Sequence, residues 1–414
     1  MRILWVKAGR LLPVDTGGKI RSYNILKHLA RTNELTFCSY YGGSRDVDYE
    51  VQIRRCFAGA MVIHTGAPES APAKGLHYLL HAFDRAPYAV SKFTSTKVRR
   101  LITESFEERK FDVAVCDFLS ASLNFPDGLA VPSVLFQHNV ESALWRRQDK
   151  HESNPIKRLA FKLEAKKMQR YEAATVGRFH HVIAVSENDR EQMNAMTDPS
   201  RISVVPTGVD LAQYSAAAGT KPDPRLVIFL GSMDWEANID GVDYFCRDMW
   251  PRIRSAIPEA RLRIVGRNPH PRVKRLAGES IEVTGTVSNV IEHLKQAAVV
   301  VVPLRIGGGT RLKIYEAMAM GKAVVSTTIG AEGLDVEHGR NILLADTEAG
   351  FAQSVISLLC DAQLRRRIEA AAQELAARYD WSIIARRFEE VLERVAHASS
   401  SEQPRQAAAA AGNS

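Results

Sequence analysis

The sequence contains few cysteines, and they follow no pairing pattern. Five are scattered over 414 residues, and no two lie at the spacing of a metal site or a disulfide framework: Cys38, Cys56, Cys116, Cys246 and Cys360. An odd, dispersed set is typical of reduced thiols in a core. The sequence therefore favours a reducing cytosol and indicates no zinc site.

Long apolar runs are also missing. No stretch reaches the roughly 18 consecutive apolar residues that a membrane-spanning helix needs. The first residues, MRILWV, read as a strand of mixed character. They are not a secretory signal, because they lack its long apolar region and its small-residue cleavage site. We therefore expect a cytoplasmic protein, and any membrane contact would be made at its surface.

Charge of one sign is only in moderate excess. The formal net charge of +8 suits an acidic ligand, an anionic membrane surface or a nucleic acid equally well. The last is disfavoured, because the chain shows no nucleic-acid-binding motif and no interleaving of aromatic and basic residues. Residues 154–178 are basic and amphipathic, so they either lie on anionic lipid or form the solvated face of a packed helix.

The rest of the sequence alternates predicted strands with predicted helices. This alternation is typical of an α/β fold with mostly parallel sheets. It is interrupted once, by a linker rich in alanine, glycine and proline. We predict an α/β domain, the linker, a second α/β domain, a closing helix and a disordered tail at residues 1–211, 212–225, 226–379, 380–398 and 399–414. Because ligands bind outside the carboxyl ends of such strands, we expect the site in a cleft between two facing Rossmann-like domains.

The most distinctive stretch is RIGGGTRLKIYEAMAMGKAVV, residues 305–325. Its glycines let a ligand approach the main chain, and Thr310 is a candidate N-cap for the helix that follows. A bound anion would explain why Arg311 and Lys313 stand in the first helical turn, where the helix dipole disfavours cations. Glu316 needs partners on a packed helix, and ribose hydroxyls would serve. The alternative is a plain turn followed by solvated side chains.

This stretch resembles the donor-site segment of retaining GT-B glycosyltransferases of family 4, through the string G-x-x-x-K-x-x-E-A-M-A-x-G-K-A-V-V. The resemblance covers nearly the whole chain. LFQHNVESALW is similar to the acceptor-side loop of that family, and FLGSMDWEANIDGVDYF and RLRIVGRNP are similar to the first strands of its nucleotide-binding domain. DWSIIARRFEEVLE resembles its C-terminal helix, which crosses back onto the first domain. The resemblance implies the GT-B fold.

The resemblance also implies roles for residues of the distinctive stretch. Glu316 matches the second glutamate of the Glu-x7-Glu motif, which holds the donor ribose in the family. The first glutamate is replaced by Gly308, which with Gly309 would give close backbone approach to the diphosphate or the sugar. The family's Arg/Lys pair is missing from the loop GSMDWEAN, so we expect Arg311 and Lys313 to replace it. We expect no metal ion, because fixed cations and helix N–H groups stabilise a leaving diphosphate themselves.

Further positions follow from the same resemblance. Positions that line the diphosphate or the base in the family fall at Gly231, Ser232, Gly285, Thr286 and Val287. Arg267 is a third candidate cation for the diphosphate, or else it caps a strand end.

His138 and a pair of glycines mark the first domain. His138 stands in a polar loop after a strand, where the matching histidine of the family approaches the sugar and the acceptor; a lone histidine is otherwise structural. Asn139 and Glu141 would orient it or touch the acceptor, and Glu141 could act as a base. Gly17 and Gly18 lack the Gly-x-Gly-x-x-Gly spacing of a dinucleotide fingerprint. They either let the backbone approach a phosphate or the acceptor, or form a tight turn.

Together these features predict a retaining, metal-independent hexosyltransferase that uses a nucleotide-diphosphate sugar as donor substrate and needs no cofactor. The acceptor would be a saccharide or a lipid-linked molecule, in exopolysaccharide, lipopolysaccharide or other glycoconjugate biosynthesis at the inner membrane face. Two alternatives stay open: a GT-B-type nucleotide-sugar epimerase, and a nucleotide-sugar-binding protein without turnover.

Overall fold

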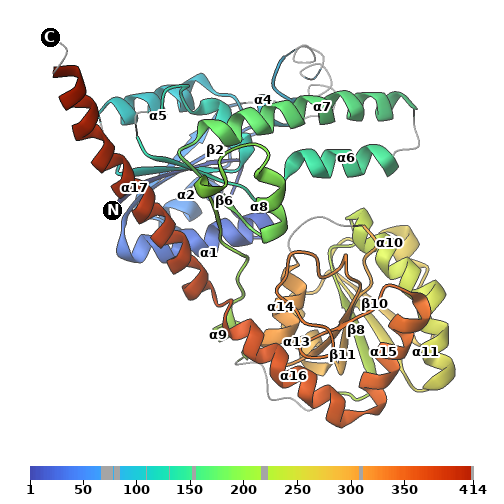
Figure 1. Ribbon diagram of the computed structural model, residues 1–414. Helices are drawn as coiled ribbons and strands as arrows, with labels where there is room; N and C mark the ends of the chain where they lie inside the picture. The colour runs from blue at the N-terminus through green and yellow to red at the C-terminus, as the bar shows by residue number, and fades with distance from the viewer. Residues whose placement is uncertain are drawn as a thin grey trace. The chain divides into compact units, whose positions relative to one another are not determined.

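The computed structural model describes residues 1–66, 78, 84–108, 110–129, 131–151, 155–215, 222–306 and 311–411. The chain divides into two compact units (Figure 1). Unit 1 comprises Met1–Pro206 and Ile384–Ser414, and unit 2 comprises Thr207–Ile383.

Unit 1 is built on a parallel sheet of seven strands in the order β3-β2-β1-β4-β5-β6-β7. The strands are β1 (Arg2–Ala8), β2 (Glu34–Tyr41), β3 (Ala60–His64), β4 (Val113–Asp117), β5 (Ser133–Phe136), β6 (His181–Ala184) and β7 (Ile202–Val204). Every residue of β4 and β5 is buried, as expected of central strands covered on both faces. The register pairs Lys7 with Asp117 and Asp117 with Phe136, so the carboxyl ends of β1, β4 and β5 lie at one level.

Helices flank this sheet on either side (Figure 1). They are α1 (Gly17–Thr32), α2 (Val47–Cys56), α4 (Tyr88–Ser91), α5 (Thr96–Glu107), η1 (Leu119–Asn124), α6 (Glu141–His151), α7 (Pro155–Arg178), α8 (Glu187–Met193) and η2 (Pro199–Arg201). Hydroxyl caps start two of them: Ser95 accepts from the Val98 amide at α5, and Ser186 accepts from the Asp189 amide at α8.

The last helix, α17 (Trp381–Ala411), packs on unit 1. Its Phe388 lies against Trp5 and Phe136, with ring centroids 5.4 and 4.9 Å apart, and Glu389 accepts hydrogen bonds from Thr32 and Asn33 at the end of α1. The expected return of the C-terminal helix to the first domain is confirmed. The helix is described to Ala411 and so includes most of the residues predicted as a tail, 399–414.

Unit 2 is built on a parallel sheet of six strands in the order β10-β9-β8-β11-β12-β13. They are β8 (Leu226–Leu230), β9 (Arg261–Val265), β10 (Ile281–Gly285), β11 (Val299–Val302), β12 (Ala323–Ser326) and β13 (Leu343–Leu344). The apolar runs of β8, β11 and β12 are wholly buried. Two parallel, Rossmann-like sheets confirm the predicted fold class.

The helices of unit 2 also flank its sheet on either side (Figure 1). They are α9 (Leu211–Ser215), α10 (Glu236–Tyr244), the π-helical η3 (Phe245–Met249), α11 (Trp250–Ala256), α12 (Pro271–Lys274), α13 (Val290–Gln296), α14 (Leu312–Ala319), α15 (Glu348–Cys360) and α16 (Ala362–Ala377). Across the described parts of both units, none of the helices has the length and apolar character needed to cross a bilayer.

Candidate functional site

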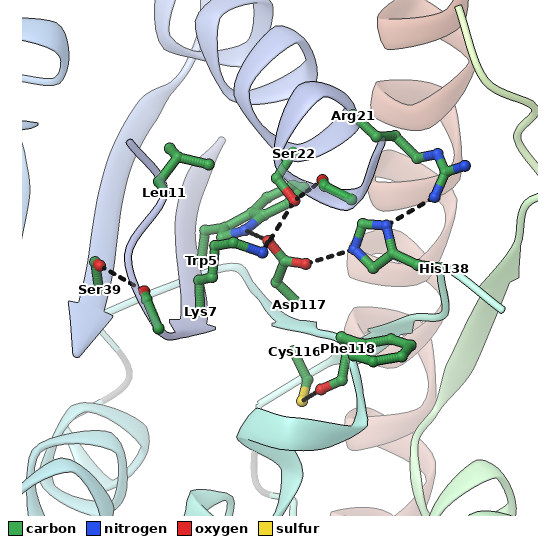
Figure 2. A network of polar contacts seen from close by, with 12 residues as sticks. Trp5, Lys7, Leu11, Arg21, Ser22, Ser39, Cys116, Asp117, Phe118 and His138 are labelled. Atoms are coloured by element: carbon green, nitrogen blue, oxygen red, sulfur yellow. Dashed lines mark hydrogen bonds and ion pairs between the residues drawn. The ribbon is translucent and has the colours of Figure 1, made fainter. Parts of the chain in front are cut away.

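In unit 1, polar side chains gather where β1 and β4 end. Asp117, the last residue of β4, is buried, and its Oδ2 accepts from Trp5 Nε1 at 2.9 Å and from Lys7 Nζ at 3.1 Å. Its Oδ1 lies 2.7 Å from His138 Nε2 (Figure 2). Burial would raise the pKa of Asp117, but the charge of Lys7 and the bond to His138 hold that pKa well below its usual range. Asp117 is therefore an anion that accepts hydrogen bonds from three side chains.

His138 lies in the loop after β5 and is 6% exposed. Its second ring nitrogen, Nδ1, lies 2.8 Å from Nη1 of Arg21, on the first turns of α1 (Figure 2). Burial lowers the pKa of His138 to about 4, in spite of Asp117. At neutral pH the imidazole is uncharged.

The glycine pair lies beside this histidine. Gly17 opens α1, and a Cβ added to Gly18 would lie 3.7 Å from His138 Nδ1, an ordinary contact distance. Thr16 stands at the N-cap position, but its side chain makes no capping hydrogen bond. The structure thus brings Gly18 and His138 together at the start of a 16-residue helix.

Glu141 opens α6 and faces a second carboxylate. Glu172 of α7 accepts from the backbone N–H groups of Glu141 and Ser142 at 2.8 and 3.0 Å, and so caps α6. Burial raises the pKa of Glu141 to about 7, and the charge of Glu172 adds to this. A carboxyl with such a pKa is suited to proton transfer.

In unit 2, the loop after β8 receives cations from two other elements. Ser232 accepts from Nε of Arg267, which follows β9, at 2.8 Å. Asn238, at the start of α10, accepts from Nζ of Lys313 on α14 at 2.9 Å, and its own amide donates to the Ser232 carbonyl at 2.9 Å. The loop GSMDWEAN contains no basic residue of its own, but Arg267 and Lys313 reach it from two other elements.

Lys313 lies in apolar surroundings. Its ammonium stands 4.7 Å from the centroid of the Phe229 ring, and desolvation lowers its pKa to about 7. The charge of Arg311 lowers this pKa further, and that of Glu316 raises it.

The two other predicted side chains of this helix face different partners. The guanidinium of Arg311 is buried, donates to the Ile329 carbonyl at 2.9 Å and lies 3.8 Å from Glu332. Glu316 is hydrogen-bonded to Tyr214 of α9, and burial raises its pKa. Lys313 therefore lies beside the loop after β8, and Glu316 lies beside α9. Arg311 points instead toward the segment after β12.

The segment predicted to read the base is close to Arg267. Gly285 ends β10 with a φ of 74°, and the exposed Thr286 accepts from the Asn268 backbone N–H at 3.4 Å. Val287 follows and is partly exposed. The predicted diphosphate residues Gly308 and Gly309 and the predicted N-cap Thr310 lie outside the described residues.

No metal centre is found in the described ranges, where no group of three or more His, Cys, Asp and Glu side chains could hold an ion. The pair Asp46 and Asp48 has the Asp-x-Asp spacing of a motif that can ligate a divalent ion. It opens α2 instead, where Asp46 accepts from the Tyr49 amide and pairs with Arg10 at 3.0 Å.

Several residues of these sites escaped prediction from the sequence. They are Trp5, Lys7, Arg21, Asp117, Glu172, Tyr214 and Asn238. Only Asp117 carried a signal, because it stands at the end of an apolar strand, where ligand-binding residues of α/β sheets collect. The others are recognised by partners far away in the sequence.

Comparison with known proteins gives two family matches and a set of curated relatives. The family model described as Glycosyltransferase Family 4 matches residues 18–213, and the one described as Glycosyl transferases group 1 matches residues 224–361. The phosphatidyl-myo-inositol mannosyltransferase of Mycolicibacterium smegmatis is 30% identical over 240 residues, which are 55% of this chain and 60% of the relative. The GDP-mannose:cellobiosyl-diphosphopolyprenol alpha-mannosyltransferase of Xanthomonas campestris is 26% identical over 223 residues, 51% of this chain and 57% of the relative. The chain thus spans about three fifths of the length of the curated relatives it matches.

Solved structures share the fold at low sequence identity. HepE of Anabaena, solved in complex with UDP, is similar with a TM-score of 0.65 and 17% identity, covering 95% of this chain and 100% of that one. WaaG, a glycosyltransferase involved in lipopolysaccharide biosynthesis, is similar with a TM-score of 0.61 and 13% identity, covering 95% and 99%. With both halves matched by family models and the architecture shared along nearly its whole length, the chain belongs to glycosyltransferase family 4 and has the GT-B fold.

Proposed function

We propose that the protein is a retaining glycosyltransferase that moves a hexosyl-type sugar from a nucleotide-diphosphate sugar to an acceptor hydroxyl. The observation that carries the proposal is the meeting of two cations, Arg267 and Lys313, on the loop after β8. Two basic side chains held at the carboxyl edge of a parallel sheet suit the diphosphate of such a donor, whose negative charge would favour the protonated form of Lys313. A matched mannosyltransferase whose name gives GDP-mannose as donor, and a structural relative solved with UDP, support this donor class.

We assign the remaining donor contacts by position. Glu316 would accept hydrogen bonds from the ribose hydroxyls, and Thr286 and Val287 would border the base. Arg267 and Lys313 would neutralise the diphosphate as it leaves, so transfer would need no metal ion. Gly231 supports this assignment, because a Cβ there would lie 2.9 Å from Lys313 Nζ and 2.7 Å from Asn238 Nδ2.

Retention fixes which face the acceptor attacks. The bond from the anomeric carbon to the diphosphate oxygen breaks, and the bond to the acceptor oxygen forms on the face that the diphosphate leaves. The acceptor proton passes to the departing phosphate oxygen. We place His138 and Gly18 of unit 1 beside the sugar and the acceptor.

The surface of α7 supports an acceptor at a membrane. Leu159 and Leu163 are 60% and 56% exposed on this helix, and Lys162, Lys166 and Arg170 are exposed around them. We propose that α7 makes a peripheral contact with anionic lipid, and that the acceptor is a saccharide or lipid-linked molecule of glycoconjugate biosynthesis.

The test is donor binding followed by transfer. A thermal-shift screen against UDP-, GDP-, ADP- and dTDP-sugars should find one donor that stabilises the protein, since a ligand of the native state raises its melting temperature. Lys313→Met should weaken that donor by about 10- to 100-fold, because a charge-assisted hydrogen bond contributes about 1.5–3 kcal/mol.

The matched control is Arg367→Met, which removes an exposed cation from α16. It should bind donor like the wild type. Equal affinity of Lys313→Met and wild type would contradict the assignment. Turnover of the free nucleotide sugar without acceptor would indicate an epimerase instead, and binding without any turnover would indicate a binding protein.

A further inference from the structure

Both ring nitrogens of His138 are occupied by side chains of unit 1. Nε2 lies 2.7 Å from Asp117 Oδ1, and Nδ1 lies 2.8 Å from Arg21 Nη1 (Figure 2). A guanidinium has N–H donors and no acceptor, so the bond from Arg21 can run in one direction only. Nδ1 must therefore carry the lone pair, and the single ring proton must be on Nε2, donated to Asp117.

Asp117 is arranged to keep that proton where it is. Its other oxygen accepts from Trp5 Nε1 and Lys7 Nζ, so the carboxylate remains ionised and remains an acceptor. Lys7 is in turn tied to Ser22 Oγ at 3.3 Å. The imidazole cannot exchange its Nε2 proton for one on Nδ1 without breaking the bonds to both neighbours.

Arg21 is the unusual member of this network. It is 1% exposed, yet it forms no ion pair among the described residues, and its Nε and Nη2 have no hydrogen-bond partner there. Burial lowers its pKa to about 10, partly countered by the charges of Asp189 and Asp117, so it stays a cation at neutral pH. Burying a guanidinium that satisfies one donor is costly, and stability alone gives no reason for it. The one bond that it does make is to His138.

The surroundings also oppose a second proton on the ring. In an imidazolium, Nδ1 would carry an N–H that points at the N–H of Arg21, so two donors would face each other. The charged ring would also be buried beside two cations, Arg21 and Lys7, with Asp117 as the one facing anion. The aromatic rings of Phe118 and Phe136 close the other sides, with centroids 5.4 and 4.5 Å from that of the imidazole.

We propose that Arg21 and Asp117 lock His138 in the neutral Nε2–H tautomer, so that the ring stands beside the substrates as a fixed, uncharged group and neither takes nor gives a proton during transfer. Arg21 is then a positioning residue that acts through His138. The inference rests on the proposed function and deepens it, because it leaves the departing phosphate as the group that takes the acceptor proton. Here no bond of His138 forms or breaks.

The first test observes the ring directly. In full-length protein labelled with nitrogen-15 on histidine imidazoles, and with His138→Gln used for assignment, His138 should show a protonated Nε2 and an unprotonated Nδ1. Both signals should stay unchanged between about pH 5 and 8, the range in which an ordinary histidine titrates. A protonated Nδ1, or titration in this range, would overturn the lock.

The second test removes Arg21. Arg21→Met should free Nδ1, so that His138 begins to titrate and its ring shifts. We expect kcat to fall by about 100-fold, the usual cost of a ~1 Å misplacement of the reacting molecules by a change away from the reacting atoms. The donor KM should stay close to the wild-type value. Arg21→Lys keeps one donor and should recover part of both the tautomer signal and the rate. Arg31→Met, which changes an exposed arginine in the last turn of the same helix, is the matched control.

The outcomes separate the lock from the proposed function. An unchanged tautomer and an unchanged kcat in Arg21→Met would overturn the role of Arg21. A wild-type protein that shows the lock but transfers no sugar from any donor would contradict the proposed function and still support the lock. If Arg21→Met does not fold, the wild-type spectrum and Arg21→Lys still decide the question.

Discussion

At the scale of single residues, each of the two candidate sites holds one ionisable group, the buried His138 and the partly buried Lys313. Lys313 in unit 2 faces the neutral acceptor Asn238 and the ring of Phe229, and no carboxylate is hydrogen-bonded to its ammonium in the described structure. His138 in unit 1 is held by one anion and one cation. In each site the protein lowers the pKa of a basic side chain, which keeps His138 neutral down to acidic pH and lets Lys313 lose its charge near neutral pH.

Donor binding should therefore be linked to protons at Lys313. Because desolvation lowers the pKa of Lys313 to about 7, most Lys313 side chains are neutral in the free protein above that pH. A bound diphosphate would raise the pKa again, so binding takes up a proton, and donor affinity falls as the pH rises above about 7.

Calorimetry measures this linkage. At about pH 8, the binding heat in buffers of different ionisation enthalpy should report uptake of most of one proton. Lys313→Met should remove that uptake, while Lys274→Met, an exposed lysine of α12, should leave it in place. Binding by wild type without proton uptake would show that Lys313 does not meet the diphosphate.

At the scale of elements, α7 presents two different faces. Its inner face contributes Met168 and Val176 to the core and the carboxylate of Glu172 to the cap of α6. Its outer face exposes Leu159 and Leu163 among basic residues. Exposed leucines cost free energy in water and gain it at a lipid surface, which is why we assign this face to a membrane.

Vesicle binding tests that assignment. The double variant Leu159→Ser, Leu163→Ser should lose at least about tenfold in affinity for vesicles containing anionic lipid, since burial of one leucine contributes about 1.5–3 kcal/mol. Val47→Ser, an equally exposed apolar residue on α2, is the control. Binding that is equally strong on purely zwitterionic vesicles, or unaffected by the double variant, would remove α7 as the contact.

At the scale of the whole molecule, the chain leaves unit 1 after Pro206 and returns to it at Ile384. The returning segment also packs into the core of unit 1. Phe388 of α17 is fully buried between Trp5 of β1 and Phe136 of β5, the two strands that lead into the His138 site. The last helix therefore belongs to the core that supports the site.

Truncating that anchor should destabilise unit 1. Phe388→Ala should cost about 3–5 kcal/mol, the usual range for a phenylalanine deleted from a core. Amide hydrogen exchange should rise in β1 and β5 and stay unchanged in the strands of unit 2. Arg387→Ala, next to it on the exposed face, should change stability by no more than about 0.5 kcal/mol. Unchanged exchange in Phe388→Ala would mean that α17 is not part of this core.

The sequence by itself determined the parallel strands, the helices between them, the return of the last helix and the family, because these follow from local periodicity and from contiguous strings. It also pointed to His138, Lys313 and Glu316. It did not show their partners, since nothing in a string of residues tells which strands are neighbours. The register of β1 against β4 places Lys7 beside Asp117, 110 positions away, and folding brings Asn238 to Lys313, 75 positions away.

Only the tertiary structure decided which cations reach the loop after β8 and how His138 is protonated. Arg311 and Lys313 are equally placed as first-turn cations in the sequence, yet one packs against Ile329 and the other against Asn238, since residues two apart on a helix do not face the same way. The tautomer of His138 depends on Arg21, whose single hydrogen bond in a buried site exists only once α1 has packed on the sheet. Periodicity determines where a side chain stands along its element; packing determines which groups surround it, and these set its charge.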